Sequence, residues 1–244
     1  MDIDIYFQPI KASEYAKNTL GYYTDFHTEG NFPLWEDCDI AIIGVNEDRG
    51  ADGNKGCSIG ADVIREELFG LYHHNKDVKI CDLGNVSPGA AVSDTYHAVS
   101  DVIQSLIKKN VFVIILGGSQ DITFANYKAY EKLEQTVNLV SIDSKFDLGN
   151  DENDLSSSNF LSKIILHKPN YLFNYGHLGY QTYYVSPDEV KLMNDLYFDY
   201  ARLGEIQENT QNAEPLIRNA DILSVDVSSV RNSELSSNSN SGPN

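Results

Sequence analysis

Short apolar runs rich in Val, Ile and Leu alternate along this chain with segments of helical pattern. The runs cover residues 39–45, 78–84, 111–118, 137–143, 170–176 and 220–226. Amphipathic segments follow most of them, such as residues 93–110, for which Ser93 or Asp94 is the expected N-cap. Strands that alternate with helical segments form βαβ crossovers. The pattern therefore predicts an α/β fold with a mainly parallel sheet and helices on both faces.

Polar residues directly follow three of these runs. The three segments read GGSQD, DSKFD and SVDVS and cover residues 117–121, 143–147 and 224–228. The carboxyl ends of parallel strands meet at one edge of a sheet, where ligands bind. We therefore expect the following side chains to lie together at that edge: Gln120, Asp143, Lys145, Asp147, Asp226 and Ser228. Lys145 brings a positive charge between two of the acids.

The regular alternation begins at Asp39, so we expect three parts in the 244 residues. Residues 1–38 are expected to cover the sheet, residues 39–232 to form one α/β domain, and residues 233–244 to form a flexible polar tail. The chain ends directly after a strand that should be central, which suggests a C-terminal truncation. Between residues 180 and 210, Ser186 and Pro187 favour a helix start, and residues 196–206 favour a strand followed by a loop.

The composition excludes several classes of function. The formal net charge is −18, with 18 Lys and Arg residues, so a basic surface for nucleic acid is not expected. No apolar stretch approaches the roughly 18 residues of a membrane span, and the first residues lack a secretory signal pattern. We therefore expect a cytoplasmic protein that contacts neither nucleic acid nor membrane.

Other motifs say less about the function of the chain. The glycine-rich loop at 50–60 lacks the Lys-Ser/Thr ending of a P-loop. Ser119 is not in a G-x-S-x-G motif, which argues against a serine hydrolase. Gly117 and Gly118 are expected to allow a tight turn beside a pocket. His177 follows a strand and is a further pocket candidate, as is Ser119.

The order of these segments resembles that of the arginase family, the ureohydrolases that include agmatinases and formimidoylglutamases. Gly60, Ala61, Ile64 and Arg65 are similar to the family's first helix start, and residues 82–85 (DLGN) to its second strand end. The three strand-end segments fall where the family has G-G-D-H-S, D-A-H-x-D and S-x-D-x-D-x-x-D-P. The resemblance implies a three-layer arginase-like fold. The tyrosine-rich residues 171–184 look most like the formimidoylglutamase branch.

In the arginase family, six side chains hold two Mn²⁺ ions, whose bridging hydroxide attacks an amidine-type carbon. Carried over residue by residue, Asp143, Asp147 and Asp226 keep three of these ligands. The other three positions hold Gln120, Lys145 and Ser228, and the closing D-P is Arg231-Asn232. Both nitrogen donors are missing, and an ammonium cannot coordinate a metal. We expect the Lys145 ammonium to take the place of a metal among the acids.

Two classes of function follow from the resemblance. The favoured one is a non-catalytic or metal-deficient family member without a catalytic residue or a cofactor, which binds a small molecule or a partner chain. The alternative is an active metal-dependent hydrolase of guanidino or formimino C–N bonds. A single Mg²⁺ or Ca²⁺ held by the three aspartates, with Gln120 and Ser228 assisting, is a third arrangement that the oxygen donors allow. A homo-oligomer is also expected from the family.

Overall fold

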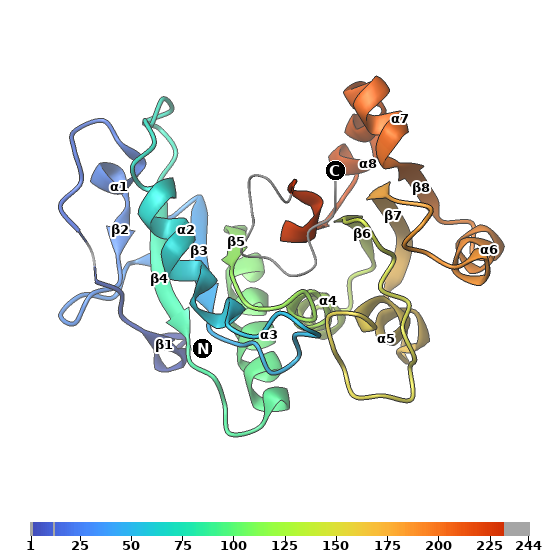
Figure 1. Ribbon diagram of the computed structural model, residues 1–244. Helices are drawn as coiled ribbons and strands as arrows, with labels where there is room; N and C mark the ends of the chain where they lie inside the picture. Colours follow the sequence, from blue (N-terminus) through green and yellow to red (C-terminus); the bar gives the residue numbers. More distant parts are fainter. Residues whose placement is uncertain (1, 12, 232–244) are drawn as a thin grey trace. The chain divides into compact units, whose positions relative to one another are not determined.

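The computed structural model describes residues 2–11 and 13–231, which divide into two compact units (Figure 1). The N-terminal unit comprises Met1–Gly50 and Lys55–Ala125, and the C-terminal unit comprises Ala51–Asn54 and Asn126–Asn244. Each unit contains one sheet, so the strands that we expected in a single sheet are distributed over two. Asn232 and the tail at 233–244 lie outside the described residues, and the predicted boundaries of the α/β domain stay a prediction.

The sheet of the N-terminal unit has the strand order β1-β4-β3-β5, and β2 also pairs with β4. Its strands are β1 (Phe7–Gln8), β2 (Asp25–Phe26), β3 (Ile40–Val45), β4 (Ile80–Val86) and β5 (Phe112–Leu116). All pairs are parallel except β1 with β4. The first 38 residues thus contribute two short strands that extend the sheet beyond β4.

The helices of the N-terminal unit pack an apolar stripe against its sheet. They are α1 (Leu20–Tyr23), α2 (Gly60–Leu68), α3 (Val92–Lys108) and the start of α4 (Ile122–Lys132), with 3-10 turns at Asp4–Tyr6, Trp35–Asp37 and Cys57–Ile59. In α3, Val99, Val102, Ile103 and Leu106 are buried, which is the helical spacing of a core-facing stripe. The N-cap residue is Ala91, so the expected N-cap at Ser93 or Asp94 is wrong. Asp94 lies in the first turn instead and stabilises the helix start by accepting a hydrogen bond from Ala91 N at 2.8 Å.

The C-terminal unit is built on a parallel sheet of order β8-β7-β6-β9. Its strands are β6 (Val137–Ile142), β7 (Leu172–Tyr180), β8 (Asp199–Arg202) and β9 (Ile222–Val225). Its helices are the end of α4, α5 (Phe160–Leu166), α6 (Pro187–Asp195), α7 (Leu203–Glu208) and α8 (Glu214–Arg218), with 3-10 turns at Thr210–Ala213 (η4) and Val227–Ser229 (η5). Buried Leu139, Phe146, Phe160 and Tyr175 belong to the core of this unit.

The region 180–210 was predicted in part. Helix α6 begins as expected, with Ser186 Oγ accepting from Glu189 N at 3.2 Å and Pro187 at its first position. The strand expected within 196–206 is β8, but the loop expected after it is wrong. Helix α7 follows instead, and Glu205 stabilises its start by accepting a hydrogen bond from Arg202 N at 3.0 Å. Within the described residues, no helix has both the length and the apolar composition that crossing a membrane requires.

Candidate functional site

In the C-terminal unit, the carboxyl ends of β6 and β9 place two predicted acids side by side. Residue Ile142 pairs with Val225 in the parallel register, so Asp143 and Asp226 occupy neighbouring positions just beyond the two strands. Asp226 N donates to the carbonyl of Ile142 at 3.0 Å, which continues the ladder by one more bond. The expected convergence of these two strand ends is therefore present.

Asp143 is the centre of the resulting cluster. Its side chain is buried, and its Oδ1 accepts hydrogen bonds from Ser228 Oγ at 2.9 Å, Lys145 N at 3.1 Å and Ser144 Oγ at 3.3 Å. Burial raises the pKa of Asp143, and the negative charge of Asp226 raises it further. The hydrogen bonds to Asp143 act in the opposite direction, because they stabilise the carboxylate.

Asp147 returns to the same cluster through a left-handed turn, with φ at +53°. It lies close enough to Asp143 for the two negative charges to repel each other. Burial, followed by the negative charge of Asp143, raises the pKa of Asp147 well above its usual range. Carboxyl groups that share one buried site disfavour full ionisation, because each carboxylate raises the pKa of its neighbour.

Asp226 and Ser228 form a compact turn next to this pair. Asp226 Oδ1 accepts from Ser228 N at 2.6 Å, and its carbonyl oxygen accepts from Ser229 Oγ at 2.6 Å. Ser228 is buried, and its hydroxyl group links the turn to Asp143. Four of the six predicted site residues, namely Asp143, Asp147, Asp226 and Ser228, therefore come together in the C-terminal unit.

Lys145 differs from its expected role. Its side chain is exposed, and its Nζ lies 5.8 Å from the centroid of the Tyr184 ring. Across residues 2–11 and 13–231, no carboxylate lies within ion-pair distance of this ammonium. Its charge lowers the pKa of Asp147 only weakly compared with the effect of burial. The backbone N–H of Lys145, rather than its ammonium, contacts Asp143, so the expected exchange of an amine for a metal has no direct contact to support it.

His177 supports the cluster from within the sheet. It is completely buried in β7, and its Nε2 lies 3.0 Å from the carbonyl oxygen of Asp143. The carbonyl can only accept, so Nε2 carries the hydrogen and Nδ1 accepts from the Tyr175 hydroxyl group at 2.9 Å. Burial lowers the pKa of His177 to about 4. Both ring nitrogens are engaged, which makes His177 a positioning residue for Asp143 and not the pocket residue that we expected.

The remaining predicted site residues lie in the N-terminal unit, in the turn between β5 and α4. Gly117 and Gly118 have φ values of +73° and +74°, and a Cβ atom on Gly117 would lie 2.6 Å from Ala61 N. The backbone therefore requires glycine at Gly117. Ser119 donates a short hydrogen bond from its hydroxyl group to Asp121, and Gln120 O accepts from Thr123 N at 2.9 Å.

A second group of buried acids, which we did not predict from the sequence, lies in the N-terminal unit. Asp121 accepts short hydrogen bonds from Ser119 and Tyr96, and burial raises its pKa. Burial also acts on Glu47, but hydrogen bonds from Arg49 and Thr95 outweigh it and hold the pKa of Glu47 below its usual value.

The Glu47 contacts explain this difference. The Arg49 guanidinium donates from Nε to Oε1 at 2.9 Å and from Nη2 to Oε2 at 2.6 Å, and Thr95 Oγ1 donates at 2.8 Å. Glu47 and Asp121 lie just after β3 and β5. Asp143 was predicted from its position after a strand, and the same criterion could have predicted these two acids.

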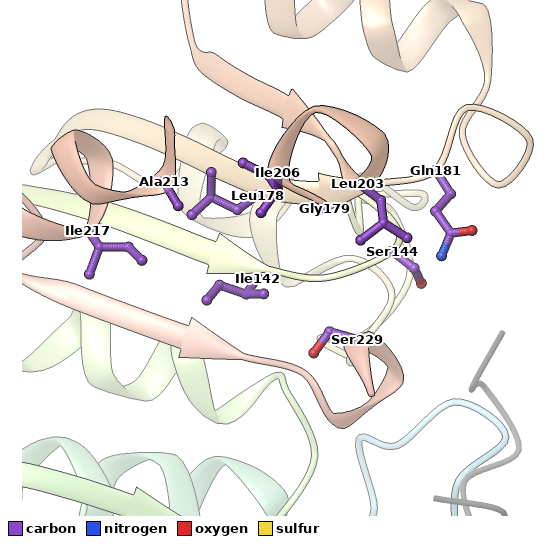
Figure 2. Close-up of a pocket in the computed structure, with 10 residues that line it drawn as sticks. All are labelled: Ile142, Ser144, Leu178, Gly179, Gln181, Leu203, Ile206, Ala213, Ile217 and Ser229. Atoms are coloured by element: carbon purple, nitrogen blue, oxygen red, sulfur yellow. The ribbon is translucent and has the colours of Figure 1, made fainter. Parts of the chain in front are cut away.

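A cavity of about 170 Å³ opens beside the aspartate cluster of the C-terminal unit (Figure 2). Its lining comes from β6, β7, α7, η4, α8 and η5: Ile142, Ser144, Leu178, Gly179, Gln181, Leu203, Ile206, Ala213, Ile217 and Ser229. Apolar side chains predominate, and Ser144 and Ser229 are sequence neighbours of Asp143 and Ser228. A ligand pocket of this kind typically combines an apolar lining with a few polar groups.

The residues of the C-terminal unit do not fit the two-manganese centre that the resemblance implies. Ser228 stands where the resemblance implies a carboxylate ligand, and its hydroxyl group donates a hydrogen bond to Asp143 at 2.9 Å. The Lys145 ammonium cannot coordinate, and both nitrogens of His177 are engaged in hydrogen bonds. The donor set in this unit is thus three carboxyl groups and one hydroxyl group, without an imidazole ligand.

The sequence and the structure are both similar to those of known proteins. A family model described as the arginase family matches residues 38–233. A formimidoylglutamase from Macrococcus caseolyticus is 33% identical over 133 residues, which cover 52% of this chain and 42% of the relative. A formimidoylglutamase from Lysinibacillus sphaericus is 24% identical over 185 residues, or 72% of this chain and 56% of the relative. The chain thus spans about half the length of the curated relatives it matches.

Solved structures show the same fold. The crystal structure of Trypanosoma cruzi formiminoglutamase with Mn²⁺ has a TM-score of 0.73 at 18% identity, covering 82% of this chain and 73% of that one. The formimidoylglutamase from Bacillus subtilis also has a TM-score of 0.73, at 17% identity, with 96% and 78% covered. At these identities the likeness establishes the fold alone.

Proposed function

The chain belongs to the arginase family, and we propose that it is a metal-deficient member that binds a small ligand without hydrolysing it. The three-layer arginase-like fold expected from the sequence is confirmed by the structural neighbours, and so is the resemblance to the formimidoylglutamase branch. Family members with that name are hydrolases of C–N bonds. The proposal concerns whether this chain retains the metal centre for such chemistry.

One observation carries the proposal: Lys145 and Ser228 stand at two of the positions where the family has metal ligands, and the Lys145 side chain is exposed while Ser228 is hydrogen-bonded to Asp143. A two-metal hydrolase needs enough carboxylate and imidazole ligands to hold the metals that activate water. The Lys145 ammonium cannot be such a ligand, because it has no free electron pair. The hydroxyl group of Ser228 and the backbone N–H of Lys145 instead donate hydrogen bonds to Asp143.

The second candidate is an active hydrolase of formimino or guanidino C–N bonds. Sequence similarity to formimidoylglutamases favours it, because one of these relatives is 33% identical over about half of the chain. In this alternative, Asp143, Asp147 and Asp226 would hold a metal together with ligands other than those of the family. The two candidates differ in metal content and in turnover, so one set of measurements separates them.

The test measures manganese bound per chain after incubation with excess Mn²⁺ and removal of free metal. We expect well under one equivalent for the natural sequence and no release of formamide or ammonia from formimidoylglutamate. The triple variant Gln120→His, Lys145→His, Ser228→Asp restores the family's residue types and should raise bound manganese toward two equivalents. About two equivalents of manganese per natural chain, together with turnover, would refute the proposal that this chain is a metal-deficient family member.

A matched control separates a restored site from added surface ligands. The variant Gln211→His, Lys191→His, Ser93→Asp makes the same three residue changes at exposed positions. We expect its manganese content to equal that of the natural chain. If the restored variant folds but binds no more manganese than this control, then Gln120, Lys145 and Ser228 do not occupy the family's metal-ligand positions.

A further inference from the structure

A second hollow adjoins the apolar cavity at the carboxyl ends of β7 and β8. Its volume is about 290 Å³, and its lining includes the polar side chains of Thr182, Gln207 and Arg202. Gln181 and Leu203 line both the second hollow and the apolar cavity. The two spaces therefore share a wall, and both lie at the edge of the sheet where ligands bind in parallel α/β folds.

Arg202 is the charged residue among those that line the second hollow. The parallel register places it opposite Tyr180, at the ends of β8 and β7. In the part of the chain that the structure describes, no carboxylate lies within ion-pair distance of its guanidinium. The nearby Glu205 accepts a hydrogen bond from the backbone N–H of Arg202 and so stabilises the start of α7. The guanidinium can thus receive an anion.

The apolar cavity is polar at one end only. Figure 2 shows Ser144, Gln181 and Ser229 on the right of the view with Leu203, whereas Ile206 and Ile217 lie toward its centre and left. Because Gln181 and Leu203 also line the second hollow, the polar end of the cavity is the end that adjoins Arg202. The combined space changes from apolar to cationic along its length.

We propose that the two hollows bind a small monocarboxylate with an apolar body, its carboxylate on Arg202 and its body between Ile206, Ala213 and Ile217. This inference rests on the proposed function, since it names the ligand class of a family member that binds without hydrolysis. A guanidinium recognises a carboxylate through two parallel hydrogen bonds. An apolar cavity of about 150 Å³ is known to hold a benzene ring, so a cavity of about 170 Å³ suits a phenyl group.

Charge argues against the more polar alternatives. A second carboxylate would have to enter the apolar cavity without a cationic partner among the lining residues, which costs several kcal/mol in a low-dielectric environment. The formal charge of −18 opposes an anionic ligand at long range. At about 0.1 M salt this repulsion is screened beyond roughly 10 Å, so the local contact with Arg202 dominates.

The experiment titrates metal-free chain in EDTA with 3-phenylpropionate and with 3-phenylpropan-1-ol by calorimetry. The two probes share the phenyl group and the chain length but differ in charge. We expect saturable binding of the acid, about tenfold or more tighter than binding of the alcohol. Equal affinity for the two probes, or binding of neither up to millimolar concentration, would overturn the proposal.

Variants locate the two ends of the ligand. Arg202→Gln should weaken 3-phenylpropionate binding at least about tenfold without affecting the alcohol, and Arg202→Lys should recover part of the loss. Ala213→Phe should abolish binding of both probes by filling the cavity. Arg218→Gln is the matched control, because Arg218 is exposed, pairs with Glu214 at 3.5 Å and should leave binding unchanged. Arg202 is exposed, so its variants remain informative even if Ala213→Phe does not fold.

The test separates this inference from the proposed function. EDTA removes metal, so binding that depends on Arg202 supports the carboxylate site whatever the manganese measurement shows. Conversely, two equivalents of manganese with turnover would refute the proposal of a metal-deficient family member, but the binding of 3-phenylpropionate measured in EDTA would be unchanged. If Arg202→Gln binds 3-phenylpropionate as tightly as the natural chain does, the carboxylate site is wrong even where the manganese result stands.

Discussion

At the residue scale, Lys145 tests whether an amine stabilises the aspartate cluster. Its ammonium is exposed over the Tyr184 ring, so Lys145→Met should change the free energy of unfolding by less than about 1 kcal/mol. Removing the partner of a buried ion pair typically costs about 3–5 kcal/mol. Urea denaturation at pH 7 distinguishes the two values. Lys191→Met, which removes an exposed lysine paired with Asp195, is the control and should behave alike.

A loss above about 3 kcal/mol in Lys145→Met alone would contradict the observed geometry. It would show that the ammonium reaches Asp143 or Asp147 in solution, as the sequence led us to expect. Similar small effects in Lys145→Met and Lys191→Met would instead support the observed geometry, in which the Lys145 ammonium is exposed and does not pair with the aspartates.

His177 gives the site a definite dependence on pH. Burial lowers the pKa of His177 to about 4, whereas an unfolded histidine has a pKa near 6.5. Between these values the unfolded chain binds one more proton than the folded chain, so the stability present above pH 6.5 is lost as pH falls toward 4. This single group should cost about 2 kcal/mol between pH 7 and pH 5.

Urea unfolding of the natural chain and of His177→Gln at both pH values measures this contribution. The variant should be less stable at pH 7, because a buried polar contact is disturbed, but its stability should fall less on acidification. His74→Gln removes an exposed histidine and serves as the control for acid effects elsewhere in the chain. Parallel pH profiles for the natural chain and His177→Gln would show that His177 titrates normally.

At the scale of elements, the turn from β5 into α4 depends on a glycine. In Gly117→Ala the new Cβ atom would lie 2.6 Å from Ala61 N, and φ would remain near +73°. We expect a loss of about 2 kcal/mol or more in the free energy of unfolding. Gly30→Ala is the control, because a Cβ atom there meets nothing within 4 Å. Thermal or urea unfolding that is equal for the two variants would contradict this account.

The sequence predicted those elements whose local pattern decides their structure. The apolar runs at β3, β4, β5, β6 and β9 became strands, and Ser186 with Pro187 marked the start of α6. The two-residue strands β1 and β2 have no periodicity, since they exist only through pairing with β4. Likewise, the division of the strands into two sheets depends on pairing between distant segments, which no local pattern encodes.

The candidate site could likewise be predicted from the sequence only in part. The polar segments after strand ends located Asp143, Asp147, Asp226 and Ser228, and the backbone register fixes the neighbouring positions of Asp143 and Asp226. The direction of the long Lys145 side chain follows from its contact with Tyr184, which lies 39 positions further along the chain. The hydrogen bonds that engage both nitrogens of His177 arise from tertiary packing and were equally inaccessible to the sequence.

At the scale of the whole molecule, the formal charge of −18 creates a self-repulsion that opposes folding. Raising NaCl from about 10 mM to about 300 mM shortens the Debye length from roughly 30 Å to under 10 Å, so long-range repulsion is screened. The Arg65–Asp82 pair, at 2.7 Å, is buried and should be little affected. We therefore expect the Tm to rise by several degrees with salt.

A charge-reduced variant shows whether self-repulsion causes that rise. Asp151→Asn, Glu152→Gln, Asp154→Asn changes three exposed residues and brings the formal charge from −18 to −15. Its Tm in 10 mM NaCl should exceed that of the natural chain, and its gain on adding salt should be smaller, because less repulsion remains to be screened. A Tm that falls with salt in the natural chain would mean that exposed attractive pairs, such as Lys109–Glu36, outweigh the repulsion among its 36 acidic residues.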